Sequence, residues 1–283
     1  MPAIQRRFRF TLSLTLALSL ATPAAALAQG RLEAHYIASL AGIQIGEGTW
    51  TIDIGDSKYR SEANGTTTGL VRFFTGGHGT TSSHGKLTAG RPTGTVYFSS
   101  ITAGRKTDEV KLETNDGNVV DISVKPPPDK QKERVPVTKE HQHGIYDPMA
   151  ATLLPTPGDG NPLSARACER TVPIFDGRLR YDLKLAFKRM DHVHAEKGYS
   201  GPVVVCTVYF VPIAGYIPSR SAIKYIAKLR DIEAWLAPIA GTRVVVPFRI
   251  QGPTPIGQAV MQATEFVSVA APSRASASSV KMQ

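Results

Sequence analysis

The chain has 283 residues, a formal net charge of +10 and only two cysteines. This length can form one large β domain or two small ones. The basic residues are dispersed rather than gathered with aromatic residues in a stripe, which argues against binding to nucleic acid. Phosphate loops, dinucleotide glycine fingerprints and EF-hand loops are missing from the sequence, so it predicts no cofactor.

Residues 1–28 are typical of a cleavable signal peptide. Three arginines form its basic start: Arg6, Arg7 and Arg9. The uncharged run over residues 10–21 is shorter than the ~20 residues that a membrane-spanning helix needs. Small residues then predict cleavage between Ala28 and Gln29, and the short run disfavours the alternative of an uncleaved anchor. We therefore expect an exported, soluble protein with no transmembrane segment after cleavage.

Cleavage would also remove three arginines and no acidic residue, which lowers the formal charge from +10 to +7. The densest basic stretch, residues 125–139, also contains Asp129 and Glu133, so we interpret it as a solvated loop. Both cysteines, Cys168 and Cys206, lie in the mature part. In an oxidising compartment two such thiols usually pair, which predicts a disulfide; two independent buried thiols are the alternative.

The first half of the mature chain indicates β-strands throughout. Residues 32–40 alternate as a strand, and Ala41-Gly42 is typical of a turn. Within residues 43–54 the apolar positions change from odd to even, and Gly46 and Gly48 lie where a bulge could absorb this change of face. Asn64-Gly65 predicts a tight turn after the next strand.

Glycine-rich residues 76–79 indicate a mobile turn. Three strand candidates follow, over residues 93–100, 109–113 and 119–124, with a turn at residues 115–117 between the last two. The proline-rich, charged residues 126–143 predict an exposed loop. Asp147-Pro148 begins the one clear helix signal, a segment of about two turns that Pro155 ends.

The second half indicates further strands, over residues 179–187, 203–211, 234–238, 242–250 and 258–269. Residues 239–241 predict a hairpin, whereas residues 223–229 fit a strand or a helix equally well. We predict one β-rich domain over residues 29–270 and a disordered tail over residues 271–283. The fold class is mostly β: a large curled antiparallel sheet or a partly open, barrel-like fold with one or two short helices.

Two kinds of motif could supply a catalytic or a metal site. Ser-x-x-Lys occurs at Ser83/Lys86 and at Ser221/Lys224, but the other motifs of serine–lysine enzymes do not accompany it. Histidine pairs with one residue between them occur at His141/His143 and His192/His194. Such a pair on a strand could supply two zinc ligands, with Glu140 or Asp191 as a third. Because both stretches are polar and loop-like, exposed histidines are the preferred interpretation.

Several short sequence segments occur in a characteristic order. They are Gly42-Ile43-Gln44-Ile45-Gly46-Glu47, Tyr146-Asp147-Pro148-Met149-Ala150-Ala151, Val172-Pro173-Ile174-Phe175-Asp176-Gly177-Arg178, Cys206, Pro212-Ile213-Ala214-Gly215-Tyr216 and Trp235-Leu236-Ala237-Pro238. Together they resemble a bacterial exported family known as domain of unknown function 3108. The resemblance covers nearly all of the mature chain. It implies a β-rich periplasmic protein of the cell envelope and carries no catalytic residue over to this chain.

These observations favour a non-catalytic envelope protein that binds an apolar ligand, such as a lipid, or another envelope protein on its curled sheet. Exported lipid carriers with curled sheets bind acyl chains in a concavity, and this analogy rests on fold alone. The alternative is an envelope hydrolase or a metal-dependent enzyme that uses one of the histidine pairs.

Overall fold

The computed structural model describes residues 29–68, 76–88, 91–129, 131–158 and 160–271. The predicted signal peptide and residues 272–283 of the predicted tail lie outside the described residues. In the described part of the chain, no helix combines the length and the apolar composition that crossing a bilayer requires.

Strands dominate the structure. They are β1 (Gly30–Leu40), β2 (Ile43–Ile54), β3 (Lys58–Thr67), β4 (Gly77–Thr88), β5 (Arg91–Ala103), β6 (Lys106–Asn115), β7 (Asn118–Lys125), β8 (Leu154–Pro155), β9 (Arg170–Phe175), β10 (Arg180–His194), β11 (Lys197–Gly198), β12 (Ser200–Ala214), β13 (Ile232–Pro238), β14 (Val244–Thr254) and β15 (Gly257–Ala270). Within the described ranges, four short helical segments accompany them: the 3-10 turns η1 (Glu140–Gln142), η2 (Ala150–Thr152) and η3 (Ala165–Ala167), and the helix α2 (Ser221–Ile226).

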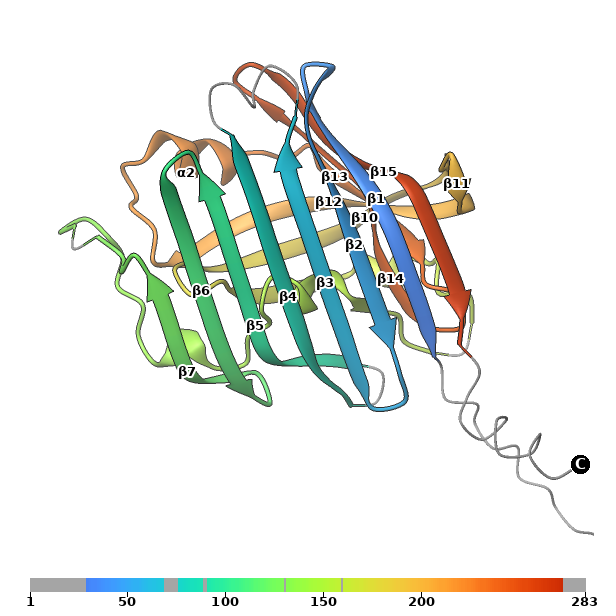
Figure 1. The fold of residues 1–283 in the computed structure, drawn as a ribbon, viewed down its shortest axis with the longest axis horizontal. Coiled ribbons are helices and arrows are strands. Elements are labelled where there is room, and N and C mark those ends of the chain that lie inside the picture. Colours follow the sequence, from blue (N-terminus) through green and yellow to red (C-terminus); the bar gives the residue numbers. More distant parts are fainter. Residues whose placement is uncertain (1–28, 69–75, 89–90, 130, 159, 272–283) are drawn as a thin grey trace, which may run out of the picture.

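All the strands belong to one sheet, in the order β7-β6-β5-β4-β3-β2-β1-β15-β14-β13-β12-β10-β9, with β11 beside β15 and β8 beside β14. The first seven strands form a meander, and the last strand, β15, pairs with the first, β1. In Figure 1 the strands β1–β7 and β15 form a front layer, and β10, β12 and β13 cross behind it. The predicted class, a large curled antiparallel sheet, is therefore confirmed.

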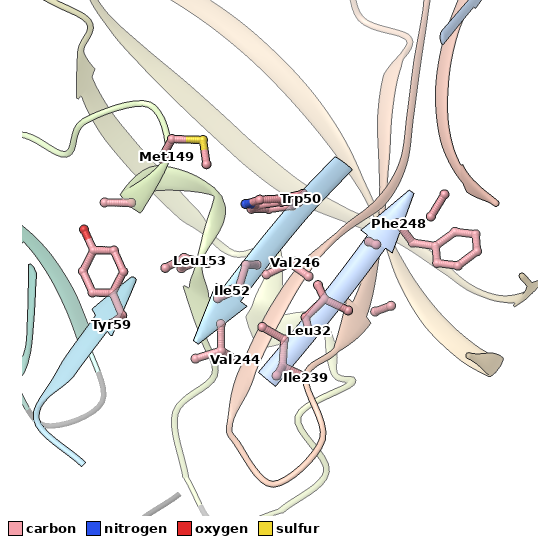
Figure 2. Close-up of a cluster of buried hydrophobic side chains, with 14 of the residues drawn as sticks. Leu32, Trp50, Ile52, Tyr59, Met149, Leu153, Ile239, Val244, Val246 and Phe248 are labelled. Atoms are coloured by element: carbon pink, nitrogen blue, oxygen red, sulfur yellow. The ribbon is translucent and has the colours of Figure 1, made fainter. Parts of the chain in front are cut away.

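Between the two layers lies the main hydrophobic core. Figure 2 shows part of it, where Leu32, Trp50 and Ile52 of the front layer lie near Val246 and Phe248 of β14. Leu32, Ile52 and Phe248 have at most 1% of their surface exposed. Alternation along β1 and β2 places these apolar side chains on one face, which is how a half-buried antiparallel strand contributes to a core.

A second core lies on the opposite face of β12, β13 and β14. β8 and the segment between β8 and β9 cover that face, with Leu154, Leu163 and Cys168 packed against side chains such as Val204 and Leu236. Cys168 forms a disulfide with Cys206 of β12, with the two Cα atoms 5.3 Å apart. The bond ties the covering segment to the strand on which it packs.

Several predicted turns are confirmed, including the hairpin at residues 239–241, and two are wrong. Ala41-Gly42 and Asp116-Gly117 have positive φ at both residues, as tight hairpin turns require. The bulge expected near Gly46 is present as a register shift between β1 and β2 at that point. Asn64-Gly65, however, lies inside β3, and Gly77 and Gly79 lie inside β4 rather than in a mobile turn.

The helix signals also need correction. The segment that begins at Asp147 forms only the 3-10 turn η2 and then the short strand β8, because Pro155 and the pairing of Leu154 with Val245 end it. The ambiguous residues 223–229 begin within helix α2 rather than a strand.

Candidate ligand-binding cavity

A cavity of about 640 Å³ opens on the concave face of the front layer. Strands β1 to β5 form its floor and sides, and Pro148, Met149 and Thr152 of the η2 segment close one side. Its volume lies within the range of about 300–1,000 Å³ that small-molecule sites usually have.

Glycines on three neighbouring strands form part of the floor. Gly48 pairs with Gly65, and Gly65 pairs with Gly79, so the three lie side by side across β2, β3 and β4. A Cβ atom at Gly48 would lie 2.4 Å from the carbonyl oxygen of Asn64, so the close approach of β2 and β3 requires glycine there. The missing side chains leave space above the sheet where a regular strand face would fill it.

Aromatic side chains lie at the core end of the cavity, where Tyr36 and Trp50 have ring centres 6.2 Å apart. Their polar atoms are already engaged within the protein. The Tyr36 hydroxyl donates to the carbonyl oxygen of Pro247 at 2.6 Å, and the Trp50 indole N–H donates to Ser61 Oγ at 2.8 Å. Burial raises the pKa of Tyr36, so its hydroxyl stays neutral. The rings therefore offer apolar surface to a ligand.

The lining of the cavity is mainly apolar. Thr81, on the same face of the sheet as the glycines, donates its hydroxyl to the carbonyl oxygen of Phe98. Alternation along β2 and β4 places the side chains of Glu47 and His78 on the opposite, exposed face. The arrangement suits a ligand that is mainly apolar.

A buried carboxylate holds the η2 segment against the sheet. Asp147 is 2% exposed, and its Oδ1 accepts hydrogen bonds from the backbone N–H groups of Met149 and Ala150 at 3.0 and 2.9 Å. Its Oδ2 accepts a hydrogen bond from Ser83 Oγ of β4 at 2.9 Å, and Ser83 is in turn bonded to the Tyr59 hydroxyl of β3. Asp147 thus connects the wall of the cavity to two of the strands that form its floor.

Burial raises the pKa of the Asp147 carboxyl to about 6, although the N–H and hydroxyl donors around it favour the ionised form. Burial, and secondarily the charge of Asp147, raises the pKa of Tyr59. All of the hydrogen bonds that Asp147 accepts come from groups that fix the local structure. The geometry of Asp147 therefore indicates a structural role, in which it holds the η2 segment against the sheet.

The two histidine pairs lie on different elements. His141 lies in η1 and bonds to Thr138, and His143, directly after η1, bonds to Asn118 of β7. His192 and His194 are exposed and lie in β10, not in a loop as expected. Among the described residues, no three His, Cys, Asp or Glu side chains gather closely enough to hold a metal ion.

Neither Ser-x-x-Lys pair has the arrangement of a serine–lysine catalytic pair. Ser83 is fully buried in the network of Asp147, whereas Lys86, three residues further along the same strand, is exposed on the other face. Ser221 and Lys224 are both exposed on α2. Sequence reasoning missed the residues that shape the cavity, chiefly Gly65 and Gly79, because it read them as turns.

The chain matches the family described as "Protein of unknown function (DUF3108)" over residues 33–264. It belongs to that family. No curated protein matches the chain.

Among solved structures, this DUF3108 protein is similar to the crystal structure of a beta-barrel-like protein of domain of unknown function DUF1849 from Brucella abortus. The two chains share 8% sequence identity with a TM-score of 0.49, and the match covers 87% of this chain and 100% of the other.

Proposed function

We propose that this protein is exported and binds a mainly apolar molecule, such as a lipid acyl chain, in the cavity on the concave face of β1–β5. The observation that carries the proposal is the floor of that cavity. Three adjacent glycines, Gly48, Gly65 and Gly79, leave open a space that side chains would otherwise fill. Aromatic rings whose polar atoms are already bonded complete the apolar lining.

A binding role also agrees with the way Asp147 is used. A general acid or base needs a proton position that a substrate can reach. Asp147 instead directs both oxygens at backbone N–H groups and at Ser83, and only 2% of the residue is exposed. We therefore assign the cavity to ligand binding rather than to catalysis.

Export to the periplasm rests on the sequence of residues 1–28 and on the environment that a disulfide needs. Intact mass measurement of the protein from its own host tests it. We expect a chain that begins at Gln29 and contains no free thiol. A chain that keeps residues 1–28, or that has two free cysteines, would contradict export.

Lipid extraction of the natively purified protein, followed by mass spectrometry, tests the ligand. We expect an apolar molecule to accompany the wild type and to be lost from Ala63→Leu, because Ala63 lines the cavity and a larger side chain fills it. Ala222→Leu is the matched control, since it adds the same bulk at an exposed position on α2. An equal amount of ligand in Ala63→Leu and wild type would place the ligand elsewhere.

A further inference from the structure

A second cavity, of about 380 Å³, lies on the other side of the segment that walls the first. One part of its lining is apolar and includes Ala151, Leu154 and Val172. The other part carries two cationic side chains, Arg91 at the start of β5 and Arg170 at the start of β9, together with Tyr146. The cavity therefore combines an apolar surface with two positive charges.

Neither arginine has an acidic partner among the described residues. The ion pairs of this part of the chain involve other side chains. Arg91 Nη2 donates to the Tyr146 hydroxyl at 3.1 Å, and Arg170 Nη2 donates to the carbonyl oxygen of Arg166 at 3.1 Å. Arg170 Nε is buried and has no hydrogen-bond partner in the described structure. Donors on both guanidinium groups thus stay available.

The local energetics also point to a missing negative charge. Burial lowers the pKa of Arg170; Tyr146 partly opposes this, and the positive charge of Arg91 adds to it. Burying a charge without a partner is costly, and two like charges at one site add to the cost. An oxyanion between the two guanidinium groups would remove both penalties, because arginine donors match the geometry of carboxylate and phosphate oxygens.

We propose that this second cavity binds a carboxylate or phosphate group attached to an apolar body, with Arg91 and Arg170 as the anion-binding residues. Tyr146 orients Arg91 through their hydrogen bond, and the apolar wall around Leu154 and Val172 contacts the rest of the ligand. The site is separate from the first cavity and does not depend on a ligand there.

Titration calorimetry with hexyl phosphate, hexanoate and inorganic phosphate tests the proposal. We expect saturable binding of the wild type, with hexyl phosphate binding more tightly than inorganic phosphate. Arg91→Gln and Arg170→Gln should each weaken binding about tenfold or more, the loss expected for one charge-assisted hydrogen bond. Arg60→Gln is the matched control, because Arg60 pairs with Glu62 on the surface of β3.

Vesicles distinguish the source of the anion. A lipid headgroup is indicated if the protein co-sediments with phosphatidylglycerol but not phosphatidylcholine vesicles, and if Arg91→Gln and Arg170→Gln abolish this co-sedimentation. Binding seen only by calorimetry would indicate a free anion. Without ligand, Arg170→Gln should unfold at a higher temperature than wild type, because an unpaired buried charge is gone. Binding that is absent with every probe, or that survives both arginine substitutions, overturns the proposal. Asp159 lies outside the described residues, so Asp159→Asn is tested as a further variant. Binding that appears only when this carboxylate is removed would show that the wild-type protein does not bind the anion, and would likewise overturn the proposal.

Discussion

Strands β2–β5 and strands β12–β14 belong to one sheet but bury their side chains differently. In β12, β13 and β14, runs of consecutive residues are buried, such as Val203–Val208 and Val244–Phe248, because the sheet is covered on both faces. In β2–β5, buried and exposed positions largely alternate, and glycine, serine and threonine occupy much of the concave face. The doubly covered half provides a packed frame, and the other half contains the cavity.

Phe248→Ala is the strongest test of this comparison. The Phe248 ring is 1% exposed and lies between the layers, with its centre 5.4 Å from that of Phe266. Its removal leaves a cavity in the frame, so we expect the free energy of unfolding to fall by about 3–5 kcal/mol in urea denaturation. A loss below about 1 kcal/mol would mean that this half is not the tightly packed one.

Removal of the disulfide should cause the next largest loss in the free energy of unfolding. Replacing Cys168 and Cys206 together by alanine keeps the second core apolar but frees the loop between them, whose ends are 38 residues apart. We expect a loss of about 2–4 kcal/mol, chiefly through the larger conformational freedom of the unfolded chain. Denaturation of the double variant and of the reduced wild type should agree; an unchanged midpoint in both would contradict a role in the frame.

Asp147 should give the stability of the cavity wall a pH dependence of its own. Its folded-state pKa, about 6, is above the unfolded value, so the neutral form suits the folded protein better. The stability it contributes is complete below about pH 4 and is lost as the pH rises to about 6, by up to about 3 kcal/mol. Asp147→Asn keeps an acceptor for the N–H groups of Met149 and Ala150 but cannot ionise.

The difference in unfolding free energy between wild type and Asp147→Asn, followed from pH 4 to pH 7, isolates this effect. We expect the wild type to lose stability relative to the variant over that range and the difference to level off above pH 6. A difference in unfolding free energy that does not change with pH would show that burial does not raise the pKa of the Asp147 carboxyl.

The smallest change in stability is expected at Ile101 of β5, on the half that contains the cavity. Its side chain is 54% exposed at the cavity, so Ile101→Ala should change the free energy of unfolding by less than about 0.5 kcal/mol. A loss close to that of Phe248→Ala would remove the distinction between the two halves.

Much of the fold could be predicted from the sequence because its signals are local. Alternation predicted most strands, and Asp116-Gly117 predicted its hairpin because both residues adopt positive φ. Asn64-Gly65 misled for a physical reason: the same dipeptide suits a turn and a place where strands approach closely. Only the pairing of Gly65 with Gly48 and Gly79, which is not local, distinguishes the two.

The candidate site was less accessible to sequence reasoning. Asp147 was predicted to begin a helix, and it does accept the N–H groups of the following turn. Its hydrogen bond to Ser83 joins residues 64 positions apart, and the cavity exists only because that turn lies over β1–β5. The two arginines of the second cavity, Arg91 and Arg170, are likewise brought together by the fold and carry no motif.

The central claim is that the cavity above Gly48, Gly65 and Gly79 holds an apolar molecule. Titration of the delipidated protein with a fluorescent fatty acid tests this claim most directly. We expect saturable binding of one molecule per chain to the wild type and to Ala222→Leu, and a loss of about tenfold or more in affinity in Ala63→Leu, whose added bulk occupies the cavity. Absence of saturable binding to the wild type, or equal affinity in Ala63→Leu, would contradict the claim.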